Sequence, residues 1–178
     1  MLKLVILDVD GILTDGKKYY DKTGLALLKT FCDKDWTAIK RMRALGLEVM
    51  FLTGDPFNVA LAENRKIDVI VNRQDGKHTD KGDYLPEICE KYGVQPNEIC
   101  FVGDDVFDIG MMRLVGYKFC PSDSPRIVKR YAAEIDCPGG QNFVMQLLDK
   151  LISLGLITEQ SFEEHIAKVY ELDLKEKF

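Results

Sequence analysis

Residues 4–15 read LVILDVDGILTD, a run of four apolar side chains that is followed at once by a pair of aspartates. Such a run is typical of a buried strand, because Leu, Val and Ile fill the strands of a parallel sheet that is covered on both faces. Asp8 and Asp10 stand where the run stops. Two carboxylates this close repel each other unless a positive group lies between them. The stretch therefore predicts a strand that ends at a cation-binding edge.

Apolar runs of strand length alternate along the whole chain with segments of helical periodicity. This alternation favours a doubly wound α/β fold, with a mostly parallel sheet and helices on both faces. The expected strands are 2–9, 47–53, 67–71, 98–103, 117–120 and 132–135, and the expected helices are 35–45, 56–65, 81–92, 106–114, 124–131 and 141–154. At 178 residues the chain suits one such domain over residues 1–155, followed by a helical tail over 156–178.

Two segments depart from the alternation. Residues 17–31 contain a turn signal, Asp-Lys-Thr-Gly, between two apolar pairs, and this predicts a β-hairpin that projects from the sheet. Its apolar side chains face nothing obvious within a single subunit. In the tail, Ser161 and Glu164 have the spacing of a capping box, which predicts a final helix.

The composition narrows the class of partner. The formal net charge is −5 and the basic residues are scattered, so nucleic acid and anionic membranes are not expected as partners. A small molecule is expected instead. The five cysteines form no C-x-x-C pair, and neither a leader pattern nor an apolar run of membrane length is visible. We therefore expect a protein of the cytoplasm.

Acidic, hydroxyl and ammonium side chains follow several of the predicted strands. The carboxyl ends of parallel strands meet at one edge of the sheet, where ligands bind. The residues concerned are Asp8 and Asp10, Thr53 and Gly54, Asp104, and Lys81 at the start of a helix. Oxygen ligands without His or Cys select Mg²⁺. Asp8 and Asp104 are the predicted carboxylate ligands, and Asp10 would add its backbone carbonyl.

A crevice with Mg²⁺ and one lysine suits a phosphate dianion. Asp8 would attack phosphorus and form an aspartyl-phosphate, which water then opens. Asp10 would give a proton to the leaving alkoxide and later take one from the water. The Thr53 hydroxyl, the Gly54 amide and Lys81 would bind the phosphoryl oxygens. An Asp-x-Asp pair alone would suit a capping turn equally well, so the interpretation rests on all these residues together.

The same residues resemble the motifs of the haloacid dehalogenase superfamily of aspartate-nucleophile phosphatases. DVDGILTD (8–15) is similar to its first motif, LTG (52–54) to the second, Lys81 to the third and GDDVFD (103–108) to the fourth. The intervals between these motifs leave no room for a cap domain. The resemblance implies an aspartyl-phosphate mechanism that depends on Mg²⁺.

Within that superfamily the chain is similar to the capless branch of 3-deoxy-D-manno-octulosonate 8-phosphate phosphatases and related nine-carbon keto-sugar-acid phosphatases. The similarity includes LTDG (13–16), YDKTG (20–24), Asp35 and Gly139-Gly140. It implies a phosphorylated eight- or nine-carbon 2-keto-3-deoxy sugar acid as substrate. It also implies a homotetramer whose hairpins form a central barrel, with a neighbouring subunit covering each active site.

Several residues differ from the sequence pattern of this branch, and they bear on the substrate. Asp55 stands where the octulosonate enzymes have Arg, and Gln141-Asn142 replaces a cationic position. Asp55 and Lys66 are candidate contacts to the sugar. The alternatives are therefore a phosphatase of another sugar phosphate, or of many, and a non-catalytic binding or assembly subunit.

Four further residues have assigned expectations. Asp105 and Asp108 would either cap the following helix or orient Lys81 and the metal waters. His78 and His165 have no partner at metal or catalytic spacing and are expected to face solvent.

Overall fold

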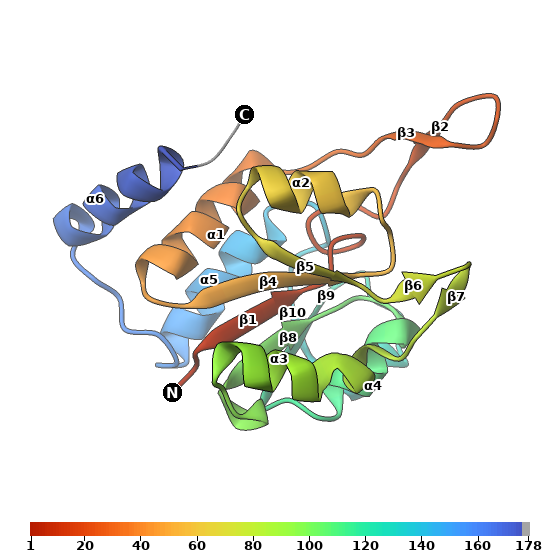
Figure 1. The fold of residues 1–178 in the computed structure, drawn as a ribbon. Coiled ribbons are helices and arrows are strands. Elements are labelled where there is room, and N and C mark those ends of the chain that lie inside the picture. The colour runs from red at the N-terminus through yellow and green to blue at the C-terminus, as the bar shows by residue number, and fades with distance from the viewer. Residues whose placement is uncertain (176–178) are drawn as a thin grey trace.

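Six parallel strands form the central sheet of the computed structural model, which describes residues 1–175 apart from the Gln74 side chain (Figure 1). The strand order is β10-β9-β8-β1-β4-β5, so β1 lies at the centre of the sheet. The strands are β1 (Leu4–Leu7), β4 (Glu48–Thr53), β5 (Asp68–Val71), β8 (Ile99–Val102), β9 (Tyr117–Pro121) and β10 (Ala133–Ile135). All neighbouring pairs are parallel. The predicted doubly wound α/β fold is confirmed.

Helices cover both faces of this sheet. They are α1 (Asp33–Ala44), α2 (Asn58–Asn64), α3 (Leu85–Tyr92), α4 (Ile109–Met112) and α5 (Phe143–Ser153), and a further helix, α6 (Phe162–Asp173), lies outside α1. The side chains of β1 alternate between two apolar cores: Val5 and Leu7 join the core beneath α1 and α5, and Leu4 and Ile6 join the one beneath α3 and α4. A strand buried on both faces needs an unbroken apolar run, which explains the LVIL sequence.

Two hairpins leave the sheet on the same side of the molecule (Figure 1). The predicted one consists of β2 (Tyr19–Tyr20) and β3 (Ala26–Leu28), which pair antiparallel. The second, β6 (Arg73–Gln74) and β7 (Lys77–His78), was not predicted. Its turn holds Asp75 and Gly76 at φ +49° and +79°, the backbone that Asp-Gly favours in a two-residue hairpin turn.

One predicted helix is nearly absent. Residues 124–131 form only a short 3₁₀ turn, Val128–Arg130. Pro125 accounts for the difference, because a proline disfavours the helical conformation at the residue before it. A helix therefore cannot begin before Pro125, and the residues from there to Tyr131 form only turns and this 3₁₀ segment.

The C-terminal segment adds a third layer. Helix α6 packs on the outer side of α1 (Figure 1), and Lys40 of α1 pairs with Asp173. Ser161 Oγ accepts a hydrogen bond from the Glu164 amide at 3.4 Å, as the predicted cap requires. Residues 176–178 of the predicted tail lie outside the described residues. Over residues 1–175, no helix is long and apolar enough to span a membrane.

A buried carboxylate joins two helices under the sheet. Asp35 of α1 is fully buried, and its Oδ1 accepts hydrogen bonds from the amides of Val144 (2.9 Å) and Met145 (3.2 Å) at the start of α5. These amides have no partner within their own helix. Burial raises the pKa of Asp35 to about 6 although the two hydrogen bonds oppose the shift.

This contact predicts different effects for two substitutions at Asp35. Asp35→Ala removes the acceptor and should lower the free energy of unfolding by about 1–3 kcal/mol, as measured by urea denaturation. Asp35→Asn keeps an acceptor and should lose less. The native carboxyl holds its proton more tightly when folded, so its contribution to stability falls as pH rises from about 4 to 6. The difference in the free energy of unfolding between the wild type and Asp35→Asn should therefore fall over the same pH range. A difference that does not depend on pH would contradict this account.

Candidate active site

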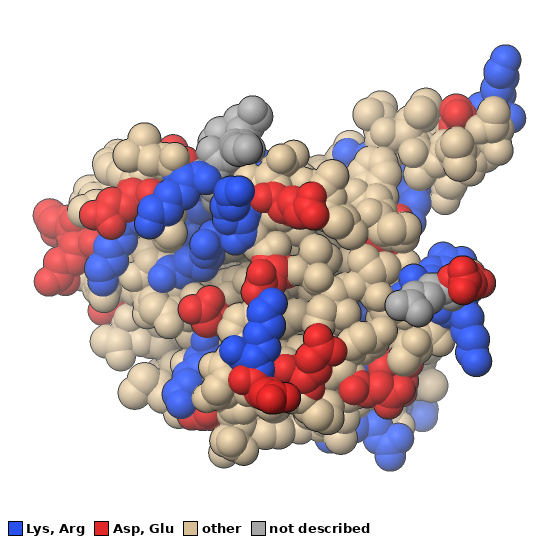
Figure 2. Space-filling view, in the orientation of Figure 1, with Lys and Arg blue, Asp and Glu red and all other residues tan. Residues whose placement is uncertain are grey.

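A cleft of about 320 Å³ opens at the carboxyl edge of the sheet. The two hairpins flank it, and Figure 2 shows the hollow between the projecting arm and the smaller hairpin below it. The lining residues are Asp8, Asp10, Gly11, Gly16, Lys18, Gly54, Asp55, Asn72, Arg73, His78, Lys81, Asp104, Asp105, Phe107 and Asp108. The structure thus brings Asp8, Asp10, Gly54, Lys81 and Asp104 together, as the strand-end argument predicts.

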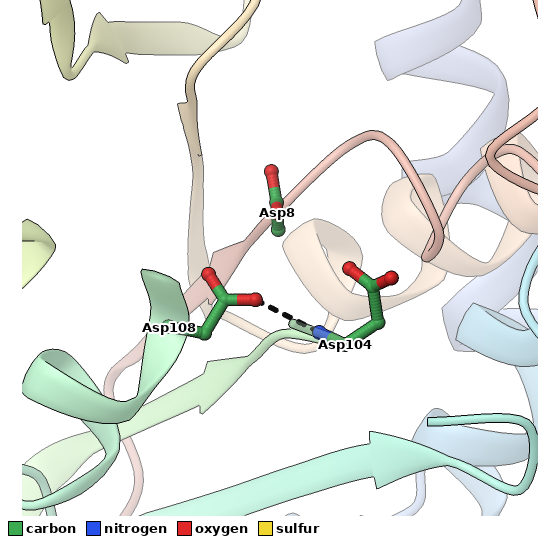
Figure 3. Close-up of side chains that lie close together, drawn as sticks. All are labelled: Asp8, Asp104 and Asp108. Atoms are coloured by element: carbon green, nitrogen blue, oxygen red, sulfur yellow. Dashed lines mark hydrogen bonds between the residues drawn. The ribbon is translucent and has the colours of Figure 1, made fainter. Parts of the chain in front are cut away.

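Three carboxylates share the floor of the cleft (Figure 3). One oxygen from each of Asp8, Asp104 and Asp108 lies within 4.8 Å of the others. Asp108 already has partners on both oxygens, because its Oδ2 accepts the amides of Asp104 and Asp105 (both 2.9 Å) and its Oδ1 faces Lys81. Asp8 has a single partner on each oxygen, the Val9 amide on Oδ1 and Lys81 on Oδ2, and the Asp104 carboxylate has none among the described residues. Asp8 and Asp104 therefore keep lone pairs that could hold a cation.

Lys81 lies between two of these acids and is almost fully buried. Its Nζ is 2.6 Å from Asp108 Oδ1 and 2.9 Å from Asp8 Oδ2. Burial would lower the pKa of this lysine, but the charges of Asp8 and Asp108 outweigh burial and raise it. The ammonium is therefore charged and fixes Asp8 from one side.

On its other side, Asp8 has no cationic neighbour among the residues that the structure describes. Burial raises the pKa of Asp8 to about 7, with Lys81 opposing the shift and Asp108 adding to it. Burial, and then the charge of Asp8, raises the pKa of Asp104 to about 8. Both acids would ionise fully at neutral pH only beside an added cation. This donor set, all oxygen, fits a divalent metal such as Mg²⁺.

Gly11 makes the approach of Asp104 possible. Its φ is +85°, and a Cβ placed on it would lie 2.1 Å from Asp104 Oδ2. Asp104 therefore rests against the backbone that follows Asp10, where the Asp10 carbonyl was predicted to act as a ligand.

Thr53 is fully buried, and only its neighbour Gly54 lines the cleft. Thr53 Oγ1 accepts hydrogen bonds from Asn58 Nδ2 (2.9 Å) and the Asp55 amide (3.3 Å). A hydroxyl has two acceptor positions and one donor hydrogen. With both acceptor positions in use, the hydrogen is left to donate. Asn58 is the first residue of α2, and the sequence analysis did not single it out.

Lysines from the projecting hairpin reach Asp10 and Asp55. Lys29 Nζ lies 2.8 Å from Asp10 Oδ1 and 2.8 Å from Asp55 Oδ2, and Lys18 Nζ lies 2.6 Å from Asp55 Oδ2. Burial opposes ionisation of Asp55, but hydrogen bonds from Lys18 and Lys29 outweigh it and hold its pKa below the usual range. The Asp10 side chain thus faces the hairpin rather than the acid cluster. The sequence analysis assigned no site role to either lysine, because nothing local marks such a role.

The remaining predicted residues are placed as follows. Asp105 caps the 3₁₀ turn Val106–Asp108 by accepting the Val106 amide at 2.6 Å, whereas Asp108 orients Lys81. Lys66 is exposed, with φ +53°, between α2 and β5. It precedes β5, so it lies at the amino edge of the sheet, and the structure does not bring it to the cleft.

The expectation that both histidines face solvent is wrong. His78 lines the cleft, where its ring stacks on Phe107 with a centroid distance of 4.5 Å. His165 lies between α6 and α1 and accepts a hydrogen bond from Arg41 Nε at 3.3 Å. Neither location could be read from spacing, because each depends on an element distant in sequence.

Fold and site together define a capless α/β hydrolase with an aspartate-rich cleft, and the family comparison agrees. Residues 25–116 match the model of the haloacid dehalogenase-like hydrolases. The 3-deoxy-D-manno-octulosonate 8-phosphate phosphatase KdsC of Salmonella typhi is 31% identical over 153 residues, which are 85% of this chain and 79% of that protein.

Solved structures show the same architecture. The cobalt-bound octulosonate phosphatase of Haemophilus influenzae superposes with a TM-score of 0.77 at 28% identity, over 86% of this chain and 90% of that one. A haloacid dehalogenase superfamily hydrolase of subfamily III A from Legionella pneumophila gives 0.81 at 25% identity, over 96% and 90%. The chain belongs to the haloacid dehalogenase-like hydrolases. Its predicted class, phosphoric monoester hydrolase without a cap domain, is confirmed.

The Gly11 contact predicts how the candidate metal site responds to a single added methyl group. Gly11→Ala should displace the Asp104 carboxylate and weaken Mg²⁺ binding about tenfold or more, as measured by titration calorimetry. Gly46→Ala is the matched control, because Gly46 has φ +88° and an added Cβ there would meet nothing within 4 Å. Both variants should lose roughly 1 kcal/mol of stability from the backbone. Equal Mg²⁺ affinity in the two variants would refute the proposed role of this close approach.

Proposed function

We propose that the chain is a Mg²⁺-dependent phosphatase that hydrolyses the phosphate of an eight- or nine-carbon 2-keto-3-deoxy sugar acid through an aspartyl-phosphate. The observation that carries the proposal is the pairing of Asp8 with buried Lys81 on one side and Asp104 on the other. A phosphoryl group placed there would meet a nucleophile and positive charge at once.

The metal would be held by the carboxylates of Asp8 and Asp104 and by the backbone carbonyl of Asp10. When bound, it would neutralise the phosphate oxygens and the negative charge between the two acids. Lys81 would neutralise the opposite side. The Thr53 hydroxyl and the Gly54 amide would donate hydrogen bonds to the phosphoryl oxygens.

In the first step an Asp8 oxygen attacks phosphorus and the bond from phosphorus to the sugar oxygen breaks. The sugar oxygen leaves with the proton of the Asp10 carboxyl, so no free alkoxide forms. Asp8 suits this role because it follows the central strand, whose side chains are fully buried. The Val9 amide also donates to Asp8 Oδ1 at 2.7 Å.

In the second step water attacks the phosphorus of the aspartyl-phosphate and gives its proton to Asp10. The phosphorus–Asp8 bond breaks, which restores the Asp8 carboxylate and releases phosphate. Lys29 (2.8 Å) and Asn58 Nδ2 (3.2 Å) contact the Asp10 carboxylate and would fix its position in both steps.

The substrate class is supported by the named relatives, which are octulosonate 8-phosphate phosphatases at 27–31% identity. We also infer that the protein works in the cytoplasm. All five cysteines are free thiols, as a reducing compartment would keep them.

A panel of phosphate esters tests the proposed function. With Mg²⁺, the 8- and 9-phosphates of the two sugar acids should show kcat/KM values at least tenfold above those of neutral hexose phosphates and an aryl phosphate. Asp8→Asn should abolish turnover of every ester, because an amide cannot form the acyl phosphate. Its thermal midpoint should stay near the wild-type value. A flat profile would instead favour a phosphatase of many sugar phosphates, and substantial turnover by Asp8→Asn would overturn the mechanism.

We further propose that the protein is a homotetramer in which each neighbour covers a cleft. The projecting hairpin carries Tyr19, Tyr20, Leu25, Leu27 and Leu28, all more than half exposed. Figure 2 shows this arm as a mostly uncharged projection. An apolar arm of this kind is a typical contact surface.

The assembly proposal predicts a change of mass in solution. Tyr19 and Leu28 pair across the hairpin. The double variant Tyr19→Ser, Leu28→Ser therefore removes two adjacent apolar side chains from one face of the hairpin. Light scattering should show a fall from the tetramer toward the 20.3 kDa subunit. Ile127→Ser, which alters an exposed residue elsewhere, should leave the mass unchanged. A wild-type protein that is monomeric at micromolar concentration would contradict the proposal.

A further inference from the structure

The β6–β7 hairpin forms one wall of the cleft. Arg73 and His78 lie directly opposite each other in its register, and both line the cleft. Cross-strand partners point to the same face of a ribbon, and adjacent residues point to opposite faces. Lys77, the neighbour of His78, therefore points away from the cleft and is exposed.

This wall is fixed to the end of β4. The Asn72 amide donates to the Thr53 carbonyl at 3.0 Å, and the Thr79 amide donates back to the Asn72 carbonyl at 2.8 Å. His78 stacks on Phe107 and lies against Gly54, where a Cβ would be 2.6 Å from its ring. The hairpin is therefore held directly beside the predicted phosphate site.

Two buried polar atoms of the wall lack partners within the described residues. Asn72 is fully buried, and its Nδ2 donates to the Thr79 carbonyl at 2.7 Å, but its Oδ1 has no hydrogen bond. His78 Nδ1 also has none. Burying a polar atom without a partner costs about 1–3 kcal/mol, so each atom would gain a hydrogen bond from a ligand hydroxyl that reaches this wall.

The charges in the cleft single out Arg73. The cationic residues that line the cleft are Lys18, Arg73 and Lys81. Lys81 is held by Asp8 and Asp108, and Lys18 is held by Asp55. Arg73 makes no ion pair with any group that the structure describes. A carboxylate entering this acidic cleft needs a cation, and the arginine fork matches a carboxylate with two parallel hydrogen bonds.

We propose that the β6–β7 hairpin forms the specificity subsite for the sugar acid, in which Arg73 binds the carboxylate and Asn72 Oδ1 and His78 Nδ1 hydrogen-bond the hydroxyl groups. The proposal rests on the proposed function. It assigns the carboxylate end of the substrate to this chain's own hairpin, on the opposite side of the cleft from the projecting arm.

Two substrates and three variants test the subsite. For 3-deoxy-D-manno-octulosonate 8-phosphate, Arg73→Ala should lower kcat/KM by about 10- to 100-fold, mainly through KM, because a charge-assisted pair is lost. For 4-nitrophenyl phosphate, which has no carboxylate, kcat/KM should change less than twofold. Arg73→Lys should recover part of the loss. Lys77→Ala removes a cation from the other face of the hairpin. Its kcat/KM should equal that of the wild type for both substrates.

The outcomes separate this inference from the proposed function. If the wild type prefers the sugar acid and Arg73→Ala keeps that preference, the subsite is refuted and the proposed function stands. If Arg73→Ala lowers kcat/KM equally for both substrates while its thermal midpoint is unchanged, the subsite is also refuted. A wild type that does not prefer the sugar acid to neutral sugar phosphates overturns the proposed function and the subsite with it.

Discussion

The pairing of one buried ammonium with two buried carboxylates is the constraint on which the site depends. Lys81 is within 2.9 Å of both Asp8 and Asp108, and removing the lysine would leave two uncompensated carboxylates in the interior. Asp108 is in turn fixed by the amides of Asp104 and Asp105. The carboxylate at the end of β1 and the acidic loop after β8 are therefore held in one geometry by a single lysine from a third element.

The parallel sheet makes this convergence possible. β1 lies between β4 and β8, so the residues that follow these three strands leave the sheet side by side. Asp8, Gly54 and Asp104, which are far apart in the sequence, therefore line the same cleft. Helices on both faces exclude water from the strands. The lower local dielectric constant strengthens the electrostatic interactions between the charged groups at the strand ends.

Much of the fold and of the acidic floor was predictable because the signals are local. Apolar runs give strands, and the common direction of the strands brings Asp8, Asp10 and Asp104 together. Lys18, Lys29 and Arg73 could not be found in this way, because a lysine or arginine in a hairpin looks the same whether it meets water or an acid. The second hairpin had a readable turn signal in Asp75-Gly76. Pro125 was likewise a readable reason to doubt the helix over 124–131.

The projecting hairpin combines an exposed apolar surface with two lysines that contact the cleft. Its strands expose apolar side chains such as Tyr19 and Leu28, and the flanking Lys18 and Lys29 hold Asp10 and Asp55. Because these residues are within a few positions of each other, the arm cannot swing without changing the environment of Asp10. The position of the arm and the placement of the Asp10 and Asp55 carboxylates at the cleft are thus coupled to each other.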